Sequence, residues 1–96
     1  MAYLPASSRE RLRVPYGQAQ DVTGYSVEIA IVPEASGEPG DADYQPAAWD
    51  GRDAVLMVGA GTGVVLAPGE YVVWTRLTAG VERPVRRSGV LTVGTP

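Results

Sequence analysis

Two segments of the chain alternate regularly between apolar and polar residues. In 24–32 every second residue from Tyr25 to Ile31 is apolar, and in 71–77 the same spacing follows a Pro-Gly turn at 68–69. Successive side chains of an extended strand point to opposite faces, so both segments are predicted to be strands with one buried face and one face at least partly in water. The residues expected to face the core are Tyr25, Val27, Ile29, Ile31, Tyr71, Val73 and Leu77.

Turn signals recur about every ten residues, a spacing that is typical of a β-sandwich rather than of helices. The last predicted strand contains Gly89, which indicates either a β-bulge or a place where another backbone comes close. We expect strands at 9–16, 24–32, 44–49, 54–58, 63–66, 71–77 and 83–93.

Tyr71 gives a more specific indication of the fold. It lies two residues after Gly69, where an immunoglobulin-like sandwich has a corner tyrosine whose hydroxyl bonds to upstream backbone. A tyrosine that only begins a half-buried strand would show the same spacing, so both interpretations stay open. The 96 residues suffice for one core. We therefore predict an all-β chain, an immunoglobulin-like β-sandwich of about seven strands over residues 9–96, with an extended N-terminal arm over residues 1–8.

The predicted arm is more apolar than a free tail would normally be. Tyr3 and Leu4 would leave apolar surface in water unless they contacted something. The arm is therefore expected to dock on a partner.

Residues 33–43 form a long connection of Pro, Gly and acidic residues with little apolar content. Such a segment is expected to be mobile unless a partner orders it. Calcium sites need six to eight converging oxygens, and the acids of this segment do not have the spacing of an EF-hand loop, so no metal is expected. These acids are Glu34, Glu38, Asp41 and Asp43.

Residue types that carry much of enzyme chemistry are missing. The sequence has no Cys and no His, which excludes disulfides, thiolate metal ligands and the commonest general base. The glycine cluster 59–63 lacks the sixth-position glycine of a dinucleotide fingerprint and leads into an extended segment, so it is interpreted as a hairpin loop. Asp50 and Asp53 flank Gly51 as turn residues do. We expect no enzyme activity and no cofactor.

The net charge of −3 is distributed unevenly along the chain. Residues 1–20 sum to +2, residues 21–70 to −8 and residues 71–96 to +3. One interpretation is ordinary solvated strand faces and loops. The other is that the first and last strands lie side by side and form a basic edge, which meets the acidic loop of a neighbouring copy or another partner. The residues of this predicted edge are Arg11, Arg13, Arg83, Arg86 and Arg87.

The two tryptophans are candidates either for the core or for an interface. Trp74 falls on the strand face opposite Tyr71, together with Val72 and Arg76. Trp49 follows a short segment that contains a proline and suits a sheet edge. A side chain of this size is usually buried, but Trp is also enriched where partners anchor.

The amino-acid composition limits the classes of binding partner and the kind of source organism. Lys, Asn and Phe are absent, a bias expected of a GC-rich gene in a high-GC bacterium or one of its viruses. An acidic chain without Lys lacks the excess positive charge that nucleic-acid binding needs. The chain start lacks the basic and apolar regions of a signal peptide, and no apolar run approaches the roughly 20 residues of a membrane span. We expect a soluble, unexported protein that contacts neither nucleic acid nor membrane.

Four segments carry a resemblance to a known group of proteins. They are Asp21-Val-Thr-Gly-Tyr-Ser-Val27, Tyr44-Gln-Pro-Ala-Ala-Trp49, Leu66-Ala-Pro-Gly-Glu-Tyr-Val-Val-Trp74 and Pro84-Val-Arg-Arg-Ser-Gly-Val-Leu-Thr-Val93. In these strand and turn motifs the chain resembles the small immunoglobulin-like structural proteins of tailed phages that infect Actinobacteria. The resemblance covers most of residues 9–93 and implies no catalytic residue.

The resemblance implies a non-enzymatic virion component, assembled in the cytoplasm of a bacterial host. The first expectation is a capsid decoration or minor capsid protein that binds the major capsid protein in multiple copies. The alternatives are a neck or tail component, and a carbohydrate-binding or adhesion module in which exposed Trp49 and Trp74 serve as stacking platforms. The candidates for partner contact are Tyr3, Leu4, Trp49, Trp74, Arg83, Arg86 and Arg87.

Overall fold

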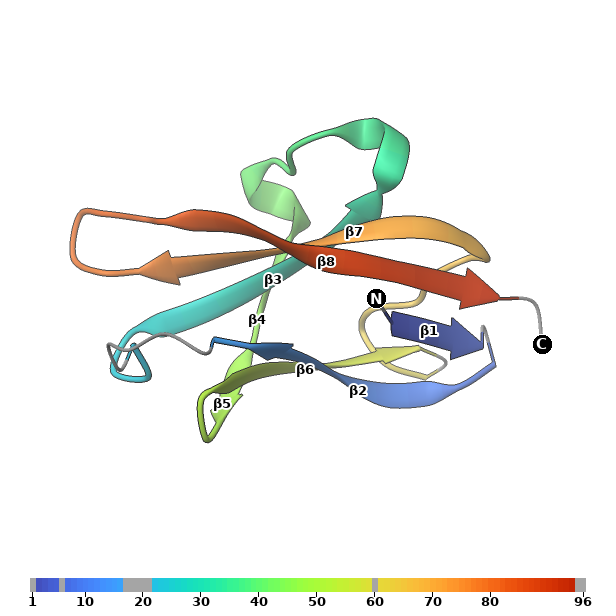
Figure 1. Ribbon diagram of the computed structural model, residues 1–96, viewed down its shortest axis with the longest axis horizontal. Coiled ribbons are helices and arrows are strands. Elements are labelled where there is room, and N and C mark those ends of the chain that lie inside the picture. The colour runs from blue at the N-terminus through green and yellow to red at the C-terminus, as the bar shows by residue number, and fades with distance from the viewer. Residues whose placement is uncertain (1, 6, 17–21, 60, 95–96) are drawn as a thin grey trace.

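The computed structural model describes residues 2–5, 7–16, 22–59 and 61–94, which form two β-sheets packed face to face (Figure 1). The larger sheet has the order β1 (Ala2–Pro5), β8 (Val85–Gly94), β7 (Gly69–Thr78), β3 (Ser26–Pro33) and β4 (Tyr44–Pro46). The smaller sheet has the order β2 (Arg9–Pro15), β6 (Asp53–Gly59) and β5 (Ala48–Asp50). The predicted all-β sandwich is confirmed.

The strand order is that of an immunoglobulin sandwich. Strands β8, β7, β3 and β4 correspond to G, F, C and C′, and β2, β6 and β5 correspond to B, E and D. The Tyr71 hydroxyl donates a hydrogen bond to the Ala67 carbonyl at 2.6 Å, so the corner-tyrosine interpretation is confirmed. Val73, two residues further on, is buried where immunoglobulin domains with a disulfide carry a cysteine.

The core lies between the two sheets and follows the predicted alternation, with one exception. Val27, Ile29, Val73 and Leu77 are buried in it, and Ile31 and Tyr71 pack against it while partly exposed. Tyr25 was expected in the core, but 42% of it is exposed and the prediction is wrong. The reason is that Tyr25 precedes the first residue of β3, in a turn where the alternation of the strand does not continue.

The predicted strand 44–49 is two strands that belong to different sheets. β4 pairs with β3, β5 pairs with β6, and Ala47 lies between them with its N–H donating to the Val27 carbonyl at 3.0 Å. Pro46 has no N–H, which suits the end of a short edge strand. The predicted strand 63–66 does not form: this segment is a loop that follows a turn closed by the Gly59 N–H and the Val64 carbonyl.

Residues 2–5, predicted as part of an extended arm, are strand β1 of the larger sheet. β1 runs parallel to β8, from the pair Ala2↔Leu91 to the pair Pro5↔Gly94. Leu4 is buried in the core, whereas Tyr3 is exposed and lies so close to Gly94 that a β-carbon there would collide with its ring. Residues 1 and 6 of the predicted arm lie outside the described residues.

The last strand contains the irregularity that Gly89 predicted. Gly89 pairs with Val73 and Arg87 pairs with Trp74, so Ser88 is an extra residue in the ladder between β7 and β8. The β-bulge is therefore confirmed, and it changes which side chains of β8 face the core.

The long acidic connection covers part of the outer face of the larger sheet. It contains two short 3₁₀ turns, η1 (Glu34–Ser36) and η2 (Asp41–Asp43), which lie over β3 and β7 in Figure 1. Ala30, Val32 and Val72 point to this outer face and are nevertheless buried. The face of β3 that was expected to be partly wet is thus largely covered.

Candidate interaction site

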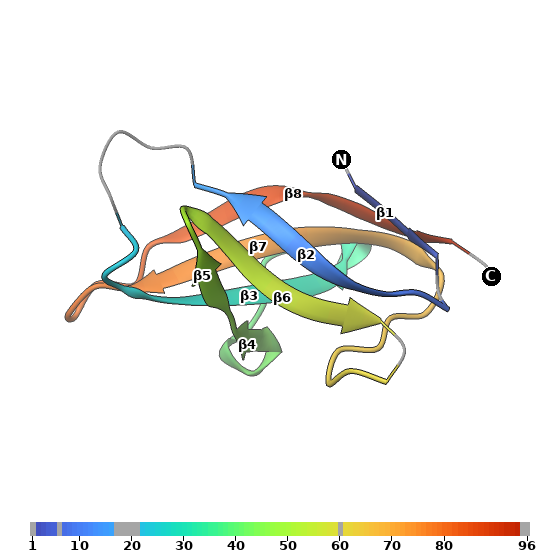
Figure 2. The same ribbon diagram turned by 90° about the horizontal axis from the view of Figure 1, so that it is seen from below.

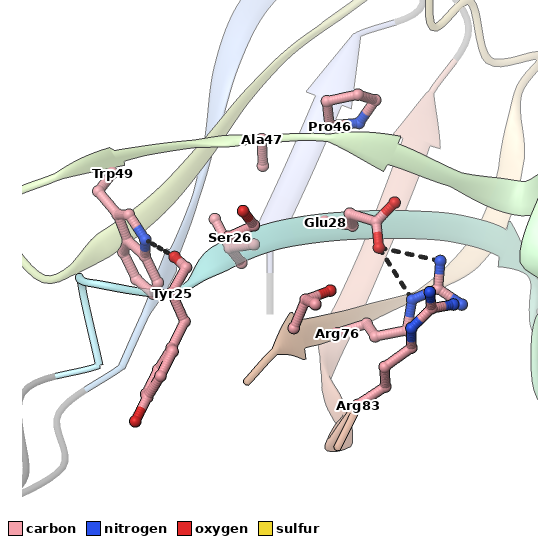
Figure 3. A pocket seen from close by; sticks show the side chains of 10 residues that line it. Tyr25, Ser26, Glu28, Pro46, Ala47, Trp49, Arg76 and Arg83 are labelled. Atoms are coloured by element: carbon pink, nitrogen blue, oxygen red, sulfur yellow. Dashed lines mark hydrogen bonds and ion pairs between the residues drawn. The ribbon is translucent and has the colours of Figure 1, made fainter. Parts of the chain in front are cut away.

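A groove of about 440 Å³ opens beside the first half of β3, where the chain crosses from β4 to β5 (Figure 3). Three parts of the chain form its walls: the start of β3, the β4–β5 crossing, and the end of β7 with the hairpin that follows. The lining residues are Tyr25, Ser26, Val27, Glu28, Pro46, Ala47, Trp49, Arg76, Thr78 and Arg83. Figure 3 shows aromatic side chains at one end of the groove and charged side chains at the other.

The aromatic end is held by Trp49. Its indole N–H donates to the Tyr25 carbonyl at 2.9 Å, and its ring meets the Tyr16 ring edge to face with centroids 5.3 Å apart. Both partners come from the neighbourhood of the β2–β3 connection, so Trp49 ties β5 to that connection. Trp49 is half-buried against the core, and the exposed Tyr25 side chain stands beside it.

The charged end is organised around Arg76, whose side chain is only 9% exposed. The Nε and Nη2 atoms of Arg76 each lie 2.9 Å from Oε1 of Glu28, and Nη1 lies 2.7 Å from Oδ1 of Asp41. The guanidinium also stacks over the Tyr44 ring, 4.1 Å from its centroid. Arg76 thereby connects β7 to β3, to β4 and to η2 of the covering loop.

Burial opposes the charge of Arg76, but hydrogen bonds to Glu28 and Asp41 outweigh it and raise the pKa of the guanidinium above its ordinary value. Burial also raises the pKa of the Tyr44 hydroxyl, although the nearby Arg76 charge acts in the opposite direction. The Tyr44 hydroxyl and the Trp74 indole N–H are buried without a hydrogen-bond partner among the described residues. Each guanidinium nitrogen of Arg76 lies at a carboxylate oxygen, so Arg76 acts as a structural cation.

Arg83 differs from Arg76 because its side chain has no hydrogen bond or ion pair within the described part of the chain. It is exposed and extends toward the charged end of the groove (Figure 3). It belongs to the hairpin between β7 and β8, whose tip is closed by reciprocal backbone bonds of Ala79 and Glu82. On either side of it, Val81 is fully exposed and Val85 is 41% exposed. Tyr25, Val81, Arg83 and Val85 are called the hairpin-end surface below.

The predicted basic edge does not exist as proposed. β2 lies in the smaller sheet, where Arg13 bonds to Asp50 and Asp53 and Arg11 lies 4.0 Å from Asp50. Two of the five arginines that were expected to face a neighbouring copy, Arg11 and Arg13, therefore lie at carboxylates within the chain. Asp41 of the acidic loop is likewise bound by Arg76.

The two remaining arginines of that edge have different environments. Arg86 stacks over the Tyr16 ring, 3.9 Å from its centroid, and donates to the Pro15 carbonyl at 3.1 Å. Arg87 is exposed on the outer face of β8, opposite Trp74, and its side chain has no partner among the described residues. Arg86 thus bridges the sheets, and Arg87 stays available.

Two other candidates for partner contact lie where they are less accessible than expected. Trp74 is on the face opposite Tyr71, as predicted, but it is half-buried on the outer side of its own sheet. Leu4 is part of the core. The hairpin-end surface was missed except for Arg83, although an apolar Val81 at the tip of a turn was a signal that the sequence contained.

No three acidic residues among those described gather closely enough to hold a metal ion. Asp50 and Asp53 face each other across the β5–β6 turn, and Gly51 has the positive φ of 62° that this turn requires, so the turn interpretation is confirmed. In the described part of the chain, no helix has the length and apolar character needed to cross a membrane. Comparison with protein-family models, with curated proteins and with solved structures finds no match to this chain.

Proposed function

We propose that this protein is a non-enzymatic structural subunit of a phage virion, which binds the major capsid protein in multiple copies as a decoration or minor capsid protein. The sequence motifs that resemble small immunoglobulin-like phage proteins support the phage setting. The immunoglobulin strand order agrees with that resemblance at the level of the fold.

The observation that carries the binding role is the hairpin-end surface. It combines Tyr25, two exposed valines and Arg83, whose side chain has no hydrogen bond or ion pair among the residues that the structure describes. Tyr and Arg are enriched among the residues that dominate binding energy in protein interfaces, and an arginine without an internal partner keeps its donors for a carboxylate or a backbone carbonyl.

The adhesion alternative has less support. Stacking of a sugar needs an exposed indole face, whereas Trp49 is packed against Tyr16 and Trp74 is half-buried under its neighbours. A neck or tail position stays a second candidate, because it would use the same kind of surface.

Quantitative mass spectrometry of purified virus particles that carry the gene for this chain tests the setting. A decoration protein is expected in hundreds of copies per particle, whereas a neck component is expected in about a dozen under closed ring symmetry. Absence of the chain from the particles would overturn the proposal.

The surface is tested by a charge reversal, Arg83→Glu, combined with Tyr25→Ser. The double variant is expected to fold normally, since both side chains are exposed, and to lose its place on the particles. Arg9→Glu is the matched control, because Arg9 is an exposed arginine at the start of β2, away from the hairpin. Equal incorporation of both variants would show that the chain binds through another surface.

A further inference from the structure

One edge of the larger sheet is only half covered. β1 is the edge strand, and it pairs with β8 from Leu91 to Gly94. Figure 2 shows β1 beside the C-terminal half of β8, and on this side no strand of the described residues pairs with β8 from Arg86 to Val90. This part, called the open stretch below, is paired with β7 on its other side only. A strand edge of this kind presents unpaired backbone donors and acceptors.

A hollow of about 170 Å³ opens at the open stretch between the two sheets. Gly89 contributes to it by having no side chain: a β-carbon built there would meet nothing within 4 Å. Gly89 lies opposite Val73, which is buried like Val14 on the other sheet. The hollow is lined by these two valines, by Leu12, Pro15 and Val90, and by two polar residues, Arg13 and Ser88. The edge therefore offers space for one apolar side chain that the chain itself does not fill.

The charges of the open stretch select among possible occupants. Arg87 is exposed on the outer face, whereas Arg86 points to the other face, over the Tyr16 ring. A second copy that paired antiparallel in a register centred on Arg87 would place the two Arg87 side chains opposite each other, and like charges across a strand pair are destabilising. An acidic strand from a different chain would instead be attracted by the positive charge of Arg87.

We infer that the open stretch binds an extended segment of a partner protein, which continues the line of β1 along β8. In strand addition of this kind, main-chain hydrogen bonds supply affinity and alternate side chains supply specificity. One apolar side chain of the segment enters the hollow beside Gly89, and an acidic side chain on its other face meets Arg87. The segment therefore alternates between apolar and acidic residues.

The test uses the full chain labelled with ¹⁵N and two blocked synthetic peptides, acetyl-Val-Glu-Val-Glu-Val-amide and acetyl-Val-Lys-Val-Lys-Val-amide. At millimolar concentration the acidic peptide is expected to shift the backbone amide signals of the open stretch and of its neighbour β1. The basic peptide is expected to leave them unchanged. Before peptide is added, the amides of the open stretch that point away from β7 should exchange quickly with solvent, because an unpaired edge gives them no acceptor.

Two charge reversals separate this site from the hairpin-end surface. Arg87→Glu is expected to weaken the acidic peptide up to about fivefold, the most that one exposed ion pair usually contributes, and to let the basic peptide bind instead. Arg83→Glu lies outside the open stretch and should leave both results as in the unaltered chain. The inference is overturned if neither peptide shifts these amides, if the shifts gather around Tyr25 instead, or if Arg87→Glu has no effect on peptide preference.

Discussion

The two outer faces of the sandwich each carry an arginine between two carboxylates, but the two clusters differ in their exposure to water. On the larger sheet, the Arg76 side chain is 9% exposed and bonds to Glu28 and Asp41 under the covering loop. On the smaller sheet, the Arg13 side chain is 46% exposed and bonds to Asp50 and Asp53. In each cluster the arginine comes from a segment that is distant along the chain from its two carboxylates.

This difference shows that the number of carboxylate partners does not by itself determine how much an ion cluster contributes to the stability of the fold. The pKa of Arg13 is raised mainly by its hydrogen bond to Asp50, and the pKa of Arg76 is raised as well, although burial is the largest influence on it and acts the other way. Water and salt screen the Arg13 cluster, so its pairs contribute little. The Arg76 guanidinium is buried, so its charge is poorly hydrated. Removing one member of this cluster would leave the remaining charges without a partner and with reduced hydration, which destabilises the fold.

The largest effect is expected for Arg76→Met, which keeps an apolar stem of similar length and removes the charge. We expect the free energy of unfolding to fall by about 2–3 kcal/mol, less than the roughly 3–5 kcal/mol known for broken buried pairs, because Glu28 stays partly hydrated. Urea denaturation measures this. Arg13→Met is the matched control and should leave the urea midpoint unchanged within experimental error. An equal loss of stability in both variants would contradict the comparison.

A smaller effect is expected for Asp41→Asn, which weakens the link between the covering loop and the sheet. The Asp41 side chain is 89% exposed, so the loss of stability should stay below about 1 kcal/mol. The loop should respond more than the global stability does. The amide of Asp43, which donates to the Gly40 carbonyl, is expected to exchange faster with solvent in the variant. Unchanged exchange would mean that Arg76 does not hold the loop.

The smallest effect at neutral pH is expected for Tyr44→Phe. The hydroxyl of Tyr44 is buried without a partner among the described residues, and the ring alone can stack under Arg76. Removing the hydroxyl should therefore leave stability unchanged or raise it by up to about 1 kcal/mol. A clear loss would show that the hydroxyl has a bonding role.

The same variant predicts a difference in alkaline solution. The pKa of Tyr44 is raised in the folded chain, so folding favours the protonated phenol. The associated stability is present below the unfolded pKa of about 10 and is lost as the pH rises through the folded pKa. Thermal unfolding from pH 8 to 11 should show a steeper decline for the unaltered chain than for Tyr44→Phe, and parallel curves would contradict this assignment.

Local pattern predicted the parts of the fold in which neighbours along one strand determine the outcome. The alternation from Val27 to Ile31 and from Tyr71 to Leu77 identified β3 and β7, and the Pro-Gly turn before Tyr71 identified the tyrosine corner. The sequence pattern did not indicate the crossing at Ala47, because the chain stays extended there while its pairing partner changes from β3 to β6.

The candidate sites needed pairings that the order of residues does not reveal. Glu28 and Arg76 are 48 residues apart, and they meet because β3 and β7 pair with these two residues in register. The predicted basic edge failed for the same reason, since it assumed that β2 lies beside β8 when β2 belongs to the other sheet. Gly89 is an exception among the site residues, because the sequence alone indicated an irregularity at this position. The bulge lies there, and the missing side chain of Gly89 leaves open space beside it.

The most direct test of the comparison is a pair of double-mutant cycles measured by urea denaturation. One cycle combines Arg76→Met with Glu28→Gln, and the other combines Arg13→Met with Asp50→Asn. The account predicts a coupling energy of about 1–2 kcal/mol for the buried pair, within the range found for residues in direct contact, and no coupling above experimental error for the exposed pair. Equal coupling energies, or a larger one for Arg13 and Asp50, would contradict the claim that burial determines what each cluster contributes.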